Sequence, residues 1–161
     1  MSRRRAIALC AGVLLSACAP APVTVDLRFP SLTTFLYAEL GRLLVYPLDQ
    51  ASLGDCPRLL TDVGMDAIGE PEWDSESRPV CSFRAGGVQI PGLSPGAHAY
   101  VVLIRDDTNT TLLTGCSVGE VYIDAPSVEV NLYPTADYVD ATRGDPLAYG
   151  SEEEKCGGVA P

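Results

Sequence analysis

The chain has 161 residues and carries 21 acidic against 11 basic side chains, a formal net charge of −10 at neutral pH. A surface with this charge repels the phosphates of DNA and RNA and the head groups of anionic lipids, so the composition argues against a nucleic-acid-binding function. The length is enough for one domain with a hydrophobic core of its own.

The first residues are organised like an export signal. Three arginines precede a mostly apolar stretch at 6–19, which is shorter than the roughly 20 residues that a helix needs to cross a bilayer. At its end, Leu15-Ser16-Ala17-Cys18 resembles the lipobox of bacterial lipoproteins, in which the signal is cut before the cysteine and the thiol is acylated.

This resemblance implies a signal peptide at 1–17, a short Pro-rich tether at 18–22 and a lipid on the sulfur of Cys18. Two or more acyl chains hold a protein firmly, at about 0.8 kcal/mol per buried CH₂. By analogy with the family, Ala19 in place of an Asp implies the outer membrane. The alternative is an ordinary secretory signal that is cut near Ala19, with no lipid attached.

The remaining cysteines are expected to form disulfides. One of the six leaves with the signal and Cys18 takes the lipid, so an even number remains in an oxidising compartment. Cys56, Cys81, Cys116 and Cys156 allow three pairings, and the sequence leaves all three open. We favour Cys56–Cys81 with Cys116–Cys156, because the first closes a poorly patterned loop and the second pins the polar C-terminal segment. A zinc site is the alternative, but there is no C-x-x-C.

The region 23–134 has the pattern of a β-rich domain. Alternating apolar residues predict a half-buried strand over 23–29, and the segment 41–49, apolar on both faces, predicts a central strand. Further short strands are predicted at 80–85, 87–92, 97–107, 112–123 and 127–134. Short connections favour antiparallel neighbours, so we expect an all-β, antiparallel β-sandwich of about seven strands.

One short helix is predicted near 56–63, where Asp55 can cap the first turn and Gly64 can end the last. The spacing in 31–40 would also permit a short helix. Two adjacent threonines and the following Gly41 favour an irregular or extended segment there instead.

Two segments are expected to lie at the surface. Residues 65–79 predict an acidic loop, and residues 135–161 predict a polar, acidic, partly ordered tail. Trp73, the only tryptophan, is expected to attach that loop to the domain; the alternative is an exposed residue that contacts a partner.

The stretch "GGVQIPGLSPGAHAYVVLIRDD" (86–107) resembles the core of transthyretin-like or carboxypeptidase-regulatory-like β-sandwiches, in which a strand leads through a Pro-Gly turn into a long strand. The likeness covers roughly residues 86–134. "VDLRFPSLTTFLY" and "GRLLVYPLD" also resemble small lipoproteins of Gram-negative bacteria. The resemblance implies a transthyretin-like or Ig-like sandwich and carries no activity with it.

One motif has the form of a catalytic turn. "GLSPG" at 92–96 matches the G-x-S-x-G nucleophile elbow. A strand rather than a helix is predicted after Ser94, and Pro95 has no backbone N–H to offer an oxyanion. The only histidine, His98, is expected to point away from Ser94 and to pack at a sheet edge. We therefore interpret the motif as a turn.

Two acid-rich loops, at 70–77 and 105–111, have the composition of Ca²⁺ loops but lack the order of an EF-hand, so we interpret them as solvated. No metal or cofactor is expected. The functional prediction is a lipid-anchored, non-enzymatic binding, adhesion or assembly module of the bacterial envelope, whose partners are the membrane and an envelope protein or polymer. The alternatives are an envelope hydrolase that uses loop carboxylates, or a structural subunit of an envelope complex.

Overall fold

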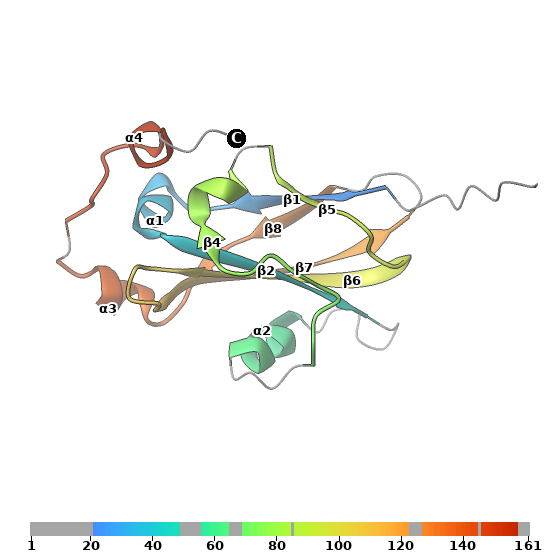
Figure 1. Ribbon diagram of the computed structural model, residues 1–161. Helices are drawn as coiled ribbons and strands as arrows, with labels where there is room; N and C mark the ends of the chain where they lie inside the picture. Colours follow the sequence, from blue (N-terminus) through green and yellow to red (C-terminus); the bar gives the residue numbers. More distant parts are fainter. Residues whose placement is uncertain are drawn as a thin grey trace, which may run out of the picture.

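The computed structural model describes residues 21–48, 56–64, 69–84, 86–122, 127–144 and 146–157. The expected signal peptide, Cys18 and the first part of the expected tether lie outside the described residues. Figure 1 shows two β-sheets, one over the other, with one helix beneath the larger sheet and the others gathered at one end.

The smaller sheet has the strand order β5-β1-β8. Its strands are β1 (Val23–Arg28), β5 (Val88–Ile90) and β8 (Ser127–Asn131). β1 pairs with β5 antiparallel but with β8 parallel, so the expectation of a wholly antiparallel fold is wrong for this pair. A parallel pair needs a long connection, and β1 and β8 lie about 100 residues apart in the chain, at opposite ends of the β-rich region.

The larger sheet has the order β3-β2-β6-β7-β9, and β4 also pairs with β2. The strands are β2 (Leu40–Pro47), β3 (Trp73–Asp74), β4 (Arg78–Pro79), β6 (Gly96–Arg105), β7 (Thr111–Val121) and β9 (Tyr133–Pro134). β6 is central, with β2 on one side and β7 on the other over nearly its whole length. The described residues thus contain nine strands, more than the seven or so expected, because short two-residue pairings add to the long strands.

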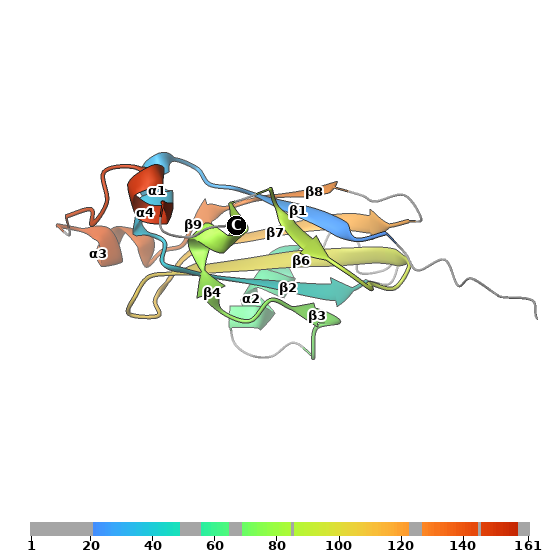
Figure 2. The same cartoon turned by 45° about the horizontal axis from the view of Figure 1, so that its top comes forward.

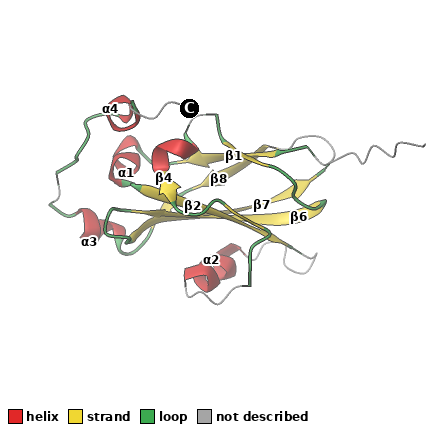
Figure 3. Ribbon diagram, viewed as in Figure 1, coloured by secondary structure: helices red, strands yellow, loops and turns green. Residues whose placement is uncertain are grey.

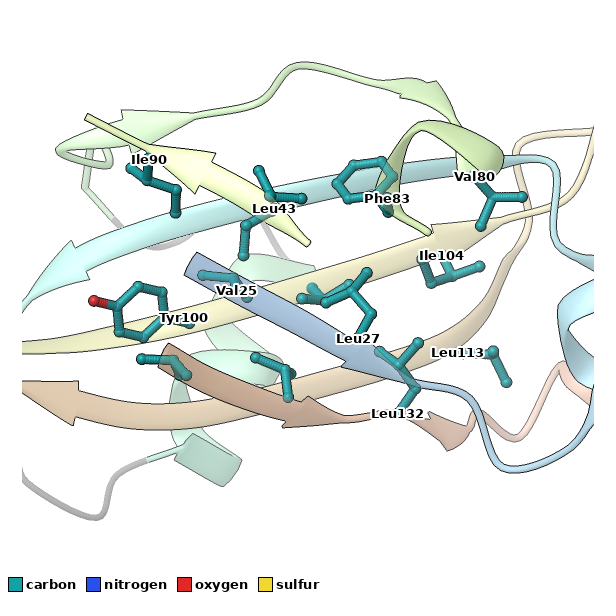
Figure 4. Close-up of a cluster of buried hydrophobic side chains, with 14 of the residues drawn as sticks. Val25, Leu27, Leu43, Val80, Phe83, Ile90, Tyr100, Ile104, Leu113 and Leu132 are labelled. Carbon is teal, nitrogen blue, oxygen red and sulfur yellow. The ribbon is translucent and has the colours of Figure 1, made fainter. Parts of the chain in front are cut away.

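The main hydrophobic core lies between the two sheets (Figure 4). On β1 the alternation predicted from sequence is confirmed, since Val23, Val25 and Leu27 are buried and the residues between them are partly exposed. These side chains face Leu43 and Tyr100 of the larger sheet within one cluster. Burial of this cluster is the main driving force for closing the two sheets on each other.

The outer face of the larger sheet is covered by α2 (Cys56–Gly64), which confirms the helix predicted near 56–63 (Figure 3). Leu59 and Leu60 of the helix pack on Leu44 and Tyr46 of β2. β2 therefore has apolar contacts on both faces, as its sequence predicts for a central strand.

A second helix, α1 (Leu32–Tyr37), replaces the irregular segment expected at 31–40. Ser31 and Thr34 form a capping box, in which the Ser31 hydroxyl accepts from the Thr34 N–H at 3.2 Å and the Thr34 hydroxyl accepts from the Ser31 N–H at 3.1 Å. Thr34 thus satisfies a free backbone group at the helix start, which outweighs its weak helix propensity. Phe35 and Leu36 are buried in the core.

The strand expected at 80–85 is a 3-10 helix, η1 (Val80–Phe83). Val80 and Phe83 are both buried, and residues three apart lie on one side of a 3-10 helix. A strand would instead direct these two side chains to opposite faces, so the helical turn buries both.

The expectation of two disulfides is confirmed, but the favoured pairing is wrong: Cys56 bonds to Cys116 and Cys81 bonds to Cys156. The physical reason is the position of the larger sheet. Cys116 packs with the cluster beneath α2, whereas Cys81 and Cys156 pack with the main core. Cys56 and Cys81 therefore lie on opposite faces of that sheet and cannot meet.

The C-terminal segment forms two short helices, α3 (Tyr138–Thr142) and α4 (Glu152–Cys156). Besides its disulfide, α4 is held by an ion pair between Glu152 and Arg84 and by Lys155, whose Nζ lies 2.8 Å from Glu39 Oε1. The single predicted helix is thus one of four α-helices in the described part of the chain.

Candidate functional site

Polar residues gather at the two ends of β6. At the start of the strand, the "GLSPG" turn brings Ser94 and His98 to Glu72. At its end, the connection to β7 contributes Asp106 and Asp107 to a cavity. The two places are considered in turn.

In the first cluster the His98 side chain is buried, and each of its two ring nitrogens has a hydrogen-bonding partner. Its side chain is 1% exposed, Nε2 lies 2.8 Å from Glu72 Oε2, and Nδ1 lies 3.0 Å from the Gly96 carbonyl oxygen. Both of these neighbours offer oxygen acceptors, so each ring nitrogen lies where it can donate a hydrogen bond. His98 is on the central strand β6, and the expectation that it packs at a sheet edge is therefore wrong.

Glu72 is the acceptor that organises this cluster. Its carboxylate accepts from the Ser94 N–H at 2.6 Å, from the Ser94 hydroxyl at 3.1 Å and from His98 Nε2 at 2.8 Å. Partial burial alone would raise the pKa of Glu72, but the hydrogen bonds from Ser94 and His98, together with the charge of His98, hold that pKa below its usual value. The pair is a structural ion pair that closes the end of β6.

His98 also lies near Ser94, contrary to the sequence expectation, with Nε2 3.4 Å from the hydroxyl oxygen. A serine nucleophile needs a base nitrogen free to accept its proton, while the acid holds the other ring nitrogen. Here Glu72 and Ser94 both face Nε2, and Nδ1 is bonded to a carbonyl. The Ser94 N–H is taken by Glu72 and Pro95 has none, so the turn offers no pair of donors for an oxyanion. This cluster does not have the geometry of a nucleophile and its base.

Tyr100 lies two residues further along β6, behind the cluster. It is fully buried, and its hydroxyl has no hydrogen-bond partner among the described residues. Burial, with a smaller contribution from the negative charge of Glu72, raises the pKa of Tyr100 to about 12. Its ring packs in the main core, as labelled in Figure 4.

The second place is a cavity of about 670 Å³ that is lined in part by residues of α1 and α3. Figure 2 shows these two helices at the same end of the molecule. Its walls come from α1 and the residues after it, from the β6–β7 connection, from α3 and from the segment 146–149. These segments are far apart in the sequence, and the cavity forms only when the C-terminal segment lies against α1.

Three carboxylates line the cavity, on Glu39, Asp106 and Asp107, and none of the described lining residues is basic. Glu39 is paired with Lys155. Asp106 Oδ1 accepts from the N–H groups of Thr108 and Thr110 at 3.0 and 2.8 Å, which shapes the turn. Asp107 is exposed and makes no hydrogen bond or ion pair with any described residue.

The rest of the lining is apolar, aromatic or hydroxylic. Tyr37 and Tyr149 contribute rings, Leu36 and Leu112 contribute aliphatic surface, and threonines supply the hydroxyl groups. The Tyr37 ring is fixed edge-to-face against Tyr138, with the centroids 6.4 Å apart. A largely preformed concave site with a few polar groups is the usual form of a small-molecule pocket.

Trp73 and the loop at 105–111, which the sequence singled out as candidate contact or ligand-binding segments, lie in different parts of the fold. Trp73 pairs with Val45 through β3 and packs against the main core half-buried, so it attaches the acidic loop to the domain as expected. The loop at 105–111 is a β-turn region in which Asn109 has a positive φ of 70°. That loop is a wall of the cavity, a role that could not be predicted from its sequence, because the other walls come from segments far away in the chain.

Among the described residues, no group of three or more His, Cys, Asp or Glu side chains could hold a metal ion. Within the same part of the chain, no helix has both the length and the apolar character that a membrane span requires.

Comparison of the chain with protein-family models, with curated proteins and with solved structures finds no match.

Proposed function

We propose that this chain is a lipid-anchored, non-enzymatic binding protein of the bacterial envelope, tethered through Cys18 to the outer membrane, and that the cavity is its binding site. The observation that carries the binding role is the cavity itself. Its volume of about 670 Å³ lies within the range of small-molecule pockets, and its walls combine rings, aliphatic surface and carboxylates.

The anchoring role rests on the sequence. Leu15-Ser16-Ala17-Cys18 follows a short apolar stretch and three arginines, as in the signals of bacterial lipoproteins. The two disulfides agree with this proposal, because such bonds persist in oxidising compartments outside the cytoplasm.

For the fold we propose a transthyretin-like β-sandwich. Two sheets that share one core agree with it, as does the long hairpin of β6 and β7 that follows the Pro-Gly turn. The proposed fold includes the parallel pairing of β1 with β8.

The anchor is tested by replacing Cys18 with Ser in cells that produce the full chain. We expect the protein to move from the membrane fraction to the soluble fraction or to stay uncleaved, and mass spectrometry of the normal protein should show acyl chains on its first residue. Cys10→Ser, inside the expected signal, is the matched control and should leave the lipid in place. A mature protein without fatty acid on Cys18 would refute the anchoring role.

The binding site is tested with a photo-reactive amino acid at Ala148, an exposed residue that lines the cavity, in intact cells. The same amino acid at Glu120, exposed on β7 and outside the cavity, is the control. We expect a defined adduct from position 148 and none from 120. Equal yields of the same adducts from both positions, or none from either, would contradict the assignment of the cavity.

An envelope hydrolase is the second candidate, and one observation favours it, namely the carboxylates in the cavity. Against it, Glu39 is paired with Lys155, and Asp106 Oδ1 already accepts hydrogen bonds from the N–H groups of its own turn. Release of soluble fragments from purified cell-wall polymer, lost in Asp107→Asn, would favour this candidate over the binding role.

A further inference from the structure

We infer that the cavity binds an organic cation, an ammonium or guanidinium group carried on a short apolar stem. This inference rests on the proposed function, because it takes the cavity as the binding site, and it adds the chemical class of the ligand. Three features of the cavity support this ligand class: the charge of its walls, an ammonium group of the chain itself that contacts the lining, and the apolar surface beside the carboxylates.

The first step is the charge of the lining. Glu39, Asp106 and Asp107 bring three carboxylates to one cavity, and the described lining residues bring no compensating cation. Lys155 neutralises Glu39 from outside the lining, which leaves the two aspartates without a cationic partner among the described residues. A concave site with walls of one sign concentrates the field and attracts the opposite charge.

The second step is that the chain already places an ammonium group, that of Lys155, against residues that line the cavity. The Lys155 side chain is 3% exposed, and its Nζ donates to Glu39 Oε1 at 2.8 Å and to the Leu36 carbonyl at 3.0 Å. The same atom lies 4.9 Å from the centroid of the Tyr149 ring. Glu39, Leu36 and Tyr149 all line the cavity. The lining therefore already binds one ammonium group through a carboxylate, a carbonyl oxygen and an aromatic ring.

The third step is that Asp106 and Asp107 bring two further carboxylates to the cavity, and neither forms an ion pair with a described residue. Asp107 has no hydrogen-bond or ion-pair partner among the described residues, and Asp106 Oδ1 is held in place by the N–H groups of its turn. Tyr37 supplies a ring, and Leu36 and Leu112 supply aliphatic surface for a stem. A ligand cation at Asp106 and Asp107 would find carboxylate and aromatic partners of the kinds that Lys155 contacts.

The experiment titrates the oxidised mature protein with pentanediamine, and in parallel with pentanediol, which has the same stem but no charge. Amide shifts at Glu39, Asp107 and Leu112 report the cavity, and the shift at Glu120 reports the distant surface. We expect saturable shifts at the cavity with the diamine and none with the diol. Added salt should weaken the binding, because the ligand is attracted by charge.

Two variants separate the cavity from the general negative charge of the protein. Asp107→Asn should weaken diamine binding about threefold, and Asp106→Asn with Asp107→Asn about tenfold, as expected for partly exposed ion pairs. An Asn at 106 retains an oxygen to accept from Thr110, whose amide signal reports whether the turn is intact. Glu120→Gln changes the net charge equally outside the cavity and should leave the affinity unchanged.

Each other outcome overturns the inference in a recognisable way. Equal binding of diol and diamine would mean a neutral polar ligand and would leave the cavity as the binding site. Diamine shifts that survive both substitutions, or that also appear at Glu120, would mean attraction to the acidic surface as a whole. No shift with either probe would refute the cation class, whereas failure of the proposed function itself is measured separately by the adducts at Ala148.

Discussion

The ion pair of Glu72 with His98 gives the sharpest test of the structural reasoning. Replacing Glu72 with Ala removes the acceptor of three hydrogen bonds, one of them from a buried ring nitrogen. A hydrogen bond to a charged group contributes about 1.5–3 kcal/mol, and the bonds from His98 and from the Ser94 N–H both end on the Glu72 carboxylate. Water can reach the site, since Glu72 is 24% exposed. We expect the free energy of unfolding to fall by about 2–4 kcal/mol.

The effect should depend on pH in a direction fixed by the pKa of Glu72. Because this pKa is lower in the folded protein than its usual value of 4.5, the stabilisation is complete above 4.5 and is lost as the pH falls through the lowered pKa. The difference between the wild type and Glu72→Ala should therefore be largest at neutral pH and shrink in acid.

The assay is urea unfolding followed by the fluorescence of Trp73, which is next to Glu72 in the chain, and by circular dichroism as a second probe. Glu72→Gln is the matched control, because it keeps an acceptor and removes only the charge; its loss should be smaller. A loss below about 0.5 kcal/mol at neutral pH, or the same loss in acid, would refute the ion pair.

Three further predictions concern other parts of the fold. Replacing Cys81 and Cys156 together with Ser should lower the free energy of unfolding by about 2–4 kcal/mol, because the bond closes a long loop, and non-reducing peptide mapping should find these two cysteines joined in the wild type. Gly115→Ala should cost about 1–3 kcal/mol in a thermal melt, because the new Cβ would lie 2.6 Å from a backbone oxygen of β8; an unchanged melting temperature would contradict the close approach. Hydrogen bonds from Arg42 hold the pKa of Asp74 below its usual value, so stability should decrease as the pH falls through that pKa, and an Asp74→Asn variant should show less of this acid sensitivity.

The sequence predicted the long strands because their signal is local. Val23, Val25 and Leu27 alternate with polar residues, and the apolar run that includes Leu44 is long enough for a strand buried on both faces. α2 was also predictable, since a proline near its start and a glycine at its end mark both limits. In each case neighbours along the chain determine the structure.

The sequence-based predictions were wrong where contacts between residues far apart in the chain determine the local structure. Thr34 makes an unusual capping box, so a segment of weak helix formers became α1. η1 is helical because Val80 and Phe83 must both reach a core that other strands build. The cavity could not be predicted, because Tyr37 and Tyr149 line it together only when the C-terminal segment lies against α1. The proximity of Ser94 to His98 follows from the sharp turn at Gly96, whose φ is 130°.

The two disulfide bonds interleave along the chain, the first cysteine of one bond lying inside the loop that the other closes. During synthesis Cys56 and Cys81 are the first pair to become available together, and they are not partners. Each bond forms correctly only after its second cysteine has been made, Cys116 in the first case and Cys156 in the other. If Cys56 and Cys81 are oxidised early, the bond between them has to be broken and exchanged, so we expect the yield of correctly bonded protein to rise when a disulfide-reshuffling enzyme is supplied.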